Sequence, residues 1–294
     1  MKKISSLLAL CLIMAFALTG CGSSATSSKN ASLGDKIDYT ITGIDAGAGE
    51  MGMAKDALSQ YDLSDWTLQS GSDATMTAAL AKAEKEKKPI VVVGYSPHWM
   101  FAKYDLKYLK DPKGVFGKAE EIHTVVHKGF ETKQPNAAKL LKQFNWTPDD
   151  MGKVMLDISN GMDPQDAAKK WIKANPDLVS KWTNGVNNGS GTIRLAYVSW
   201  ASSIASDNVI KQVLESKGYT VKLQQLQAGG MWTAVAKGDD DAMLSAWLPT
   251  THKAYYAKNK DQVTDLATNL KGTKLGLVVP KYVKIDSIED LKTK

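Results

Sequence analysis

The chain has 294 residues and a formal net charge of +6, from 37 basic and 31 acidic side chains. Its excess lysines are scattered singly, and without a basic patch we expect no nucleic-acid binding. The two cysteines, Cys11 and Cys21, both lie near the N-terminus. They leave no thiol in the rest of the chain for a disulfide or a cysteine-based metal site, and we expect neither a metal ion nor a cofactor.

The N-terminus has the form of an export signal. Two lysines precede an apolar run over residues 7–18, which is too short for a comfortable membrane span. Residues 18–21 (Leu-Thr-Gly-Cys) resemble a bacterial lipobox, in which the cysteine becomes the new N-terminus and is acylated. We therefore expect a signal peptide over residues 1–20 and a protein anchored through Cys21 at the extracytoplasmic face of the cell membrane.

Strands and helices are predicted to alternate beyond the cleavage site. Residues 21–36 are small and polar, which predicts a flexible tether. Residues 38–44 alternate like a strand and lead, through a glycine-rich turn at residues 46–49, into a helical pattern that continues to about Tyr61. Strands that alternate with helices indicate an α/β fold with mainly parallel sheets.

The second half of the chain repeats the first. Four blocks match in the same order: residues 38–44 with 192–198, 76–80 with 232–236, 90–97 with 242–249, and 124–128 with 277–281. Each copy has the pattern strand–helix–strand–helix–strand, so the repeat predicts two similar α/β lobes. Between the copies, residues 136–182 are predicted to be helical, with Thr147 and Asp163 each placed as an N-cap before a proline.

The lobe boundaries follow from this repeat. We expect lobe 1 over residues 37–127, with residues 280–294 as a candidate return to it. Lobe 2 is expected over residues 128–279 and includes the helical segment. The equivalent strands 123–128 and 275–279 are the candidate crossovers between the lobes, and therefore the predicted hinge for closure on a ligand. His123 and His127 are not expected to bind metal, because a strand does not bring them together.

Three aromatic residues follow predicted strands, at the sheet edge where open α/β proteins bind ligands. Tyr95 and Trp247 occupy equivalent positions in the two copies, each in an aromatic-x-Pro turn, and Trp200 follows the first strand of the second copy. Such rings usually pack in a core or at a rim. Two equivalent rings and a third favour an aromatic cage, which holds quaternary ammonium groups through the ring quadrupoles.

Long stretches of the chain are similar to one known family, the glycine betaine-binding component of osmoprotectant ABC importers. The resemblance is to the lipid-anchored subfamily whose halves are permuted relative to the periplasmic form. The matching stretches are residues 43–49, 66–68, 88–100, 120–123, 135–141, 195–200, 230–234, 245–255 and 276–280. The resemblance implies a two-lobed periplasmic-binding-protein-like fold of type II, with a ligand cleft between the lobes and two crossover strands.

The resemblance also implies the site. It assigns the trimethylammonium group of the ligand to a prism formed by the three rings above. It assigns the ligand carboxylate to the backbone N–H groups of Gly49 and Glu50 and to His252. The chemistry is sound, because N–H groups at a glycine-rich turn that leads into a helix attract anions and a histidine adds a donor.

Two residues depart from the family pattern. Tyr95 stands where the family usually has tryptophan, and its smaller ring face weakens the contact with a cation or admits a bulkier head group. Glu50 lies beside the implied carboxylate site. If its side chain points away, nothing changes; if it faces the cleft, it repels a carboxylate and favours choline-like cations.

The predicted function is solute binding without catalysis. The protein is expected to capture glycine betaine, proline betaine or a related osmoprotectant and to deliver it to the transmembrane and ATPase components of an ABC importer. A choline- or carnitine-specific receptor is the near alternative and differs only in ligand. A secreted hydrolase is disfavoured, because the chain has no Gly-x-Ser-x-Gly elbow and no cysteine nucleophile after processing. A structural lipoprotein would not need two equivalent aromatic turns.

Overall fold

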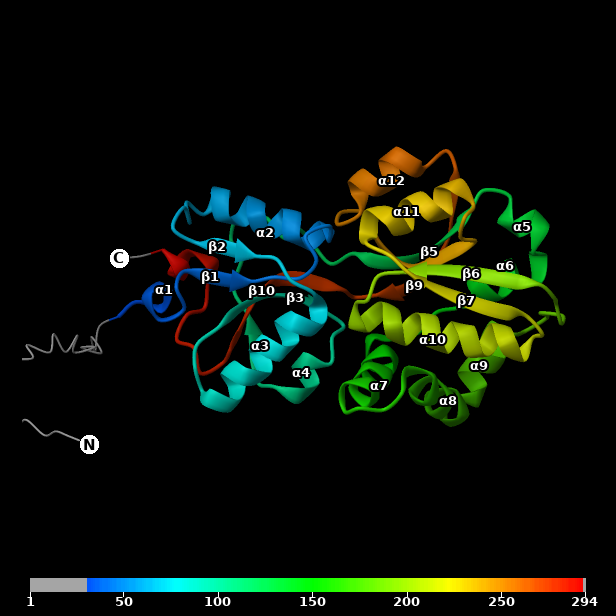
Figure 1. Cartoon of the computed structure of the whole chain (residues 1–294), viewed down its shortest axis with the longest axis horizontal. Coiled ribbons are helices and arrows are strands. Elements are labelled where there is room, and N and C mark those ends of the chain that lie inside the picture. The colour runs from blue at the N-terminus through cyan, green and yellow to red at the C-terminus, as the bar shows by residue number, and fades with distance from the viewer. Residues whose placement is uncertain (1–30, 293–294) are drawn as a thin grey trace, which may run out of the picture. The chain divides into compact units, whose positions relative to one another are not determined.

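The computed structural model describes residues 31–292 (Figure 1). The predicted signal peptide, the predicted acylation site Cys21 and most of the predicted tether lie outside the described residues. Ser32–Lys294 forms one compact unit. Within the described range, none of the helices combines the length and apolar character that crossing a membrane requires.

Lobe 1 is built on a five-stranded sheet of order β2-β1-β3-β10-β4. Its strands are β1 (Thr40–Thr42), β2 (Thr67–Gln69), β3 (Val91–Ser96), β4 (Leu106–Tyr108) and β10 (Lys274–Pro280). The helices are α1 (Leu33–Lys36), α2 (Gly49–Gln60), α3 (Asp73–Glu86) and α4 (Met100–Lys103). Figure 1 shows α2 on one face of the sheet and α3 and α4 on the other. The sheet is therefore buried on both faces, and Val91, Val92 and Val93 of β3 are fully buried.

Lobe 2 is built on a second five-stranded sheet, of order β7-β6-β8-β5-β9. Its strands are β5 (Glu121–His127), β6 (Thr192–Tyr197), β7 (Thr220–Gln225), β8 (Ala242–Leu248) and β9 (Val263–Lys271). Helices α11 (Ala228–Lys237) and α12 (Lys253–Asn259) lie on one face and α10 (Ala201–Ser216) on the other (Figure 1). Every residue of β8 is buried, as expected for a central strand covered on both sides.

The helical segment predicted between the two copies is confirmed. It forms α6 (Pro135–Gln143), α7 (Pro148–Ser159), α8 (Pro164–Ala174) and α9 (Pro176–Trp182), preceded by the short α5 (Phe130–Lys133). The Thr147 side chain accepts from the N–H of Asp150, and the Asp163 side chain accepts from the N–H groups of Gln165 and Asp166. These caps satisfy N–H groups that have no partner inside the helix, which explains why α7 and α8 begin there.

The two sheets have the same strand order, which confirms the internal repeat. In each sheet three parallel strands are followed by two further strands, and the fourth strand runs antiparallel to both of its neighbours. That fourth strand comes from the other half of the repeat. β5 ends the first copy and joins the second sheet, and β10 ends the second copy and joins the first sheet.

Because of this exchange, the chain crosses between the lobes at other residues than the sequence predicted. Residues 121–127 were expected in lobe 1 but belong to the lobe 2 sheet, and residues 274–279 were expected in lobe 2 but belong to the lobe 1 sheet. The chain passes between the sheets at residues 109–120 and 272–273, just before each exchanged strand. The sequence of a buried strand indicates burial but not its pairing partner, and this is why the boundaries shifted.

The C-terminal segment packs against lobe 1. The 3-10 helix Ile288–Leu291 is held there by a hydrogen bond of 2.9 Å from Trp66 Nε1 to the carbonyl oxygen of Leu291. The two passages between the sheets also contact each other. The N–H of Glu120 donates to Thr273 Oγ1 at 3.1 Å, and that hydroxyl donates to the Glu120 carbonyl at 2.7 Å.

Candidate ligand-binding site

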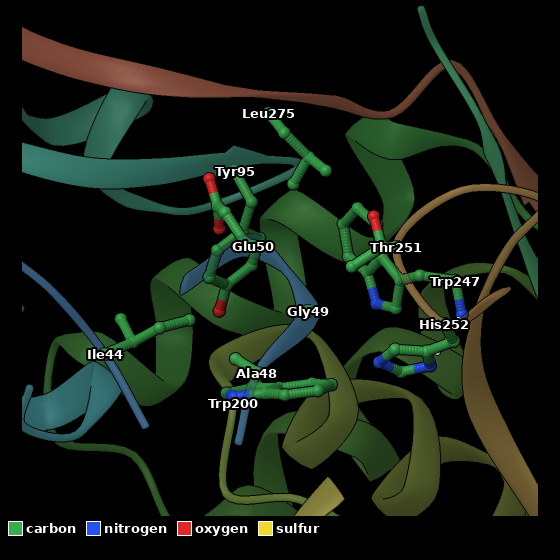
Figure 2. A pocket seen from close by; sticks show the side chains of 10 residues that line it. All are labelled: Ile44, Ala48, Gly49, Glu50, Tyr95, Trp200, Trp247, Thr251, His252 and Leu275. Carbon is green, nitrogen blue, oxygen red and sulfur yellow. Dashed lines mark hydrogen bonds between the residues drawn. The ribbon is translucent and has the colours of Figure 1, made fainter. Parts of the chain in front are cut away.

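A small pocket lies between the two lobes (Figure 2). The residues that line it come from the ends of strands and the starts of helices: Ile44, Ala48, Gly49, Glu50, Tyr95, Trp200, Trp247, Thr251, His252 and Leu275. All six ligand-binding residues expected from the sequence are among them. The pocket lies at the sheet edges where α/β folds bind ligands.

Three aromatic rings line the pocket. Tyr95 is on β3, Trp247 is on β8, and Trp200 is the N-cap residue of α10. The ring centroids of Tyr95 and Trp247 are 5.7 Å apart, with the planes at 85°. Figure 2 shows Trp200 lying across from these two rings. The exposed fractions of Tyr95, Trp247 and Trp200 are 3%, 4% and 5%, so each ring is held in place by packing and almost withdrawn from water.

The N-terminus of α2 lies at this pocket. Ala48 is the N-cap residue and has an extended backbone, so Gly49 and Glu50 are the first two helical residues. Their N–H groups have no intrahelical partner and lie at the positive end of the helix dipole. Glycine is required at position 49, because a Cβ there would lie 2.1 Å from the carbonyl oxygen of Thr251 in the opposite lobe.

His252 is a neutral hydrogen-bond donor. Its Nδ1 is within 3.3 Å of Trp232 Nε1 and 3.2 Å of the N–H of Trp247, and both of these groups can only donate. Nδ1 must therefore accept, and the ring proton is on Nε2. His252 is fully buried, and this burial lowers its pKa to about 3. Among the described residues, Nε2 has no hydrogen-bond partner, so an unused N–H lines the pocket.

The Glu50 side chain also lines the pocket and is only 3% exposed. Its Oε1 is 3.4 Å from the N–H of Gly276, which is a long hydrogen bond. Burial raises the pKa of this carboxyl to about 8, and the negative charges of Asp73 and Glu120 act in the same direction. At neutral pH the group is therefore mostly uncharged. Of the two orientations left open by the sequence, the inward one is observed.

Acidic residues of lobe 1 bind the start of α10 in lobe 2. Asp45 Oδ2 accepts a hydrogen bond of 3.2 Å from Trp200 Nε1. Asp73 accepts from the N–H of Ala201 at 3.1 Å, and within its own lobe from the Tyr95 hydroxyl at 3.1 Å. These contacts orient two of the three rings and hold the lobes together. Sequence reasoning missed both acids, and the only signal for either was the position of Asp45 directly before the glycine-rich turn.

Glu120 joins the passage between the sheets to the pocket. Its carboxylate accepts from the N–H groups of Thr250 and Thr251 at 2.9 and 3.0 Å and from the Thr251 hydroxyl. His252 follows directly, so the loop that presents its Nε2–H is fixed by a residue of the connecting segment. A further contact between the lobes runs from the Tyr255 hydroxyl to the Gly47 carbonyl at 2.8 Å.

The other histidine pair has separate partners. His123 Nδ1 lies 2.9 Å from Asp265, and His127 Nδ1 lies 3.0 Å from the carbonyl of Val235. Within residues 31–292, no group of three or more His, Cys, Asp or Glu side chains is placed to hold a metal ion.

Two lobes of the type II α/β fold, with a small aromatic pocket between them, define a substrate-binding protein of an importer. The family described as the substrate binding domain of ABC-type glycine betaine transport system matches residues 23–174 and 191–294, and the chain belongs to this family. The family consists of transporter binding proteins and not of enzymes.

Three known proteins are similar to this chain. The chain is 50% identical over 298 residues to the glycine betaine/carnitine transport binding protein GbuC of Listeria monocytogenes serotype 1/2a (strain 10403S), covering 100% of this chain and 99% of that protein. Lactococcal OpuAC, in its closed-liganded conformation complexed with glycine betaine, is 50% identical with a TM-score of 0.49, over 53% of this chain and 61% of that one. A glycine betaine, L-proline ABC transporter binding protein (ProX) from Borrelia burgdorferi is 32% identical with a TM-score of 0.47, over 51% and 57%.

Proposed function

We propose that the protein captures a glycine betaine- or carnitine-type ligand outside the cell and delivers it to the membrane components of an ABC importer. The trimethylammonium group would sit among Tyr95, Trp200 and Trp247. The ligand carboxylate would accept from His252 Nε2–H and from the first N–H groups of α2. The observation that carries the proposal is the unpartnered His252 Nε2–H in the same pocket as three buried rings.

The energies of these contacts fit a transport receptor. A desolvated cation–ring contact contributes about 2 kcal/mol, and a hydrogen bond to a charged group about 1.5–3 kcal/mol. Micromolar affinity corresponds to about −8 kcal/mol, which a few such contacts supply after the cost of ordering the ligand. The pocket needs no catalytic group for this task.

Calorimetric titration tests the ligand assignment. The protein without residues 1–21 would be titrated with glycine betaine, carnitine, proline betaine and choline, and the series repeated with Trp247→Ala. We expect saturable betaine binding that the variant loses. Phe101→Ala is the matched control, because it removes a partly buried ring that stacks on Tyr108 outside the pocket. Equal affinity of wild type and Trp247→Ala would disprove the cage.

We also propose that Cys21 carries the lipid anchor. The lipobox-like residues 18–21 and the polar stretch that follows support this assignment. Labelled palmitate is expected to enter the wild-type protein in bacterial cells and not Cys21→Ala, which should appear in the medium. Membrane retention of an unlabelled Cys21→Ala protein would reject the anchor.

Lobe closure on the ligand is the third part of the proposal, with the hinge at residues 109–120 and 272–273. The cross-lobe contacts of Asp45, Asp73 and Tyr255 support it, because an opening of the lobes would break all of them. Small-angle scattering should show a smaller radius of gyration at ligand saturation. An unchanged radius would contradict closure.

A further inference from the structure

The Glu50 carboxyl is the feature of this pocket that the capture of a zwitterion does not use. Its backbone N–H serves the proposed carboxylate site, but its side chain lies inside the same pocket, beside Tyr95 and Leu275 (Figure 2). A buried carboxyl with one long hydrogen bond can exist as a neutral acid or, if a cation lies close by, as a carboxylate. The ligand bound in the pocket therefore determines the charge of the Glu50 carboxyl.

The other charged and titratable groups around Glu50 do not compensate for it. Asp73 on α3 and Glu120 before β5 are both acidic and disfavour a second negative charge. Burial raises the pKa values of Tyr95 on β3 and Tyr108 on β4 well above the ordinary tyrosine value, so both stay neutral. His252 across the cleft stays neutral as well, because burial lowers its pKa to about 3.

His98 is a further titratable group near these residues and contacts Asp73. His98 Nε2 lies 3.2 Å from Asp73 Oδ1 and 3.5 Å from Asp73 Oδ2. Of the three titratable side chains that line the pocket, namely Glu50, Tyr95 and His252, only Glu50 has a pKa, about 8, within the range from pH 6 to pH 9.

The two ligand types place different charges next to this carboxyl. Glycine betaine brings a cation and a carboxylate, so an ionised Glu50 would face a second anion. Choline brings the same trimethylammonium group with a hydroxyl, whose oxygen can accept from His252 Nε2–H. The nearby cation then favours the ionised form of Glu50, and no ligand carboxylate opposes it.

We propose that the Glu50 side chain determines ligand selectivity: it keeps its proton when a betaine is bound and releases it when a quaternary ammonium alcohol such as choline is bound. This inference rests on the proposed function of the cage. It makes the protein a receptor for both ligand types, with a preference that moves toward choline as the pH rises.

The direction in which the choline-to-betaine affinity ratio changes with pH depends only on the protonation of Glu50 in the two complexes. Both ligands bind the same free protein, so its own titration cancels in the ratio of their dissociation constants. The pKa of Glu50, about 8 by burial, is lowered by choline and is not lowered by a betaine. Between the two resulting pKa values the choline complex holds fewer protons, and the choline-to-betaine affinity ratio rises by up to about tenfold per pH unit.

The test is calorimetric titration of choline and glycine betaine at pH 6, 7, 8 and 9, in buffers of different ionisation enthalpy. For wild type, we expect the choline-to-betaine affinity ratio to increase on the order of tenfold or more over this range. Displacement of bound betaine by choline should release protons near neutral pH. In Glu50→Gln, whose side chain cannot ionise, the ratio should not depend on pH and displacement should release no protons.

Asp207→Asn is the matched control. Asp207 is a fully buried carboxyl whose burial also raises its pKa, but it lies on α10 and does not line the pocket. This variant should keep the full pH dependence of the ratio.

Three outcomes would overturn the inference. A ratio that does not change with pH in wild type excludes the role of Glu50. A pH dependence that survives in Glu50→Gln assigns it to another group, such as the His98–Asp73 pair. Betaine binding with no choline binding at any pH leaves the proposed function intact and removes only this inference. Failure of every quaternary ammonium ligand to bind removes the proposed function itself.

Discussion

The two lobes share a topology but contribute opposite polar groups to the pocket and to the contacts between the lobes beside it. Lobe 1 supplies carboxyl groups, from Asp45, Glu50 and Asp73, whereas lobe 2 supplies side-chain N–H donors, from Trp200 and His252. The repeat therefore diverged in chemistry while the sheet order was kept. Neither lobe holds a complete site, and the polar contacts between them exist only when the lobes meet.

The equivalent aromatic turns show the same divergence on a smaller scale. Tyr95 in lobe 1 donates its hydroxyl to Asp73, which also accepts from the opposite lobe. Trp247 in lobe 2 donates its backbone N–H to His252 and so fixes which ring nitrogen carries the proton. One turn orients an acid that joins the lobes, and the other orients a donor for the ligand.

Breaking the contact between the lobes at Gly49 is expected to have the largest effect on ligand affinity. Gly49→Ala places a methyl group against the Thr251 carbonyl, a backbone atom that cannot turn away. We expect betaine affinity to fall by about 100-fold or more, because each 1.4 kcal/mol of lost closure costs a factor of ten. Calorimetry measures the affinity, and small-angle scattering should show a variant that no longer compacts.

Gly52→Ala is the control on the same helix. A Cβ at position 52 meets nothing within 4 Å, so the substitution should preserve binding and stabilise α2 by about 0.5–1 kcal/mol. Loss of binding in both variants would mean that α2 itself, and not the contact between the lobes, is responsible.

Removal of the His252 donor in lobe 2 is expected to have the second largest effect on ligand affinity. His252→Ala removes the Nε2–H, and we expect betaine affinity to fall by about 10- to 100-fold, from the 1.5–3 kcal/mol of a hydrogen bond to a charged group. Choline should lose less, because its hydroxyl is uncharged. His127→Ala serves as the control, since that ring contacts Val235 away from the pocket. An equal loss for both ligands would argue against a carboxylate at His252.

Substitution of Asp45, the acid of lobe 1 that orients the Trp200 ring, should have a moderate effect on ligand affinity. Asp45→Asn weakens the hydrogen bond from Trp200 Nε1 by removing its charge, and we expect about a five-fold loss of affinity, or about 1 kcal/mol. A double-mutant cycle with Trp200→Phe checks the cause. The effect of Asp45→Asn should vanish when the indole N–H is absent, and an additive result would place the role of Asp45 elsewhere.

The smallest effect is expected at Trp232. Trp232→Phe removes one of two donors to His252 Nδ1 and leaves the N–H of Trp247 in place. A neutral hydrogen bond contributes about 0.5–1.5 kcal/mol, so betaine affinity should fall only a few-fold. Nitrogen NMR of the imidazole should then detect some of the other tautomer. An unchanged tautomer together with a large loss of affinity would contradict a positioning role.

The fold and the three rings that line the pocket could be predicted because their signals are local and repeated. Alternation of strands and helices, the proline-marked helix starts, and the two aromatic-x-Pro turns are each visible within a few residues. The acids that join the lobes have no such signal. Asp73 begins a helix with nothing nearby to indicate that it meets the N–H of Ala201, 128 positions away.

The strand exchange and the role of Trp232 were missed for related reasons. Pairing of β5 with β8 is a long-range contact that the strand's own sequence does not encode. Trp232 is fully buried, but burial alone does not reveal that its indole N–H fixes the tautomer of His252. The orientation of Glu50 was left open, because the start of a helix presents residues both inward and outward.

The exchange of β5 and β10 also sets an order of assembly. Every strand of the second sheet lies between residues 121 and 271, so that sheet is complete in one continuous stretch of chain. The first sheet begins at residue 40, yet its interior strand β10 arrives only at residues 274–280. As the chain emerges from the ribosome and the export channel, the part made first must therefore wait for nearly the last residues. A nascent or truncated chain that stops short of them carries one finished lobe and one unfinished lobe, and it is the older lobe that stays open to proteases.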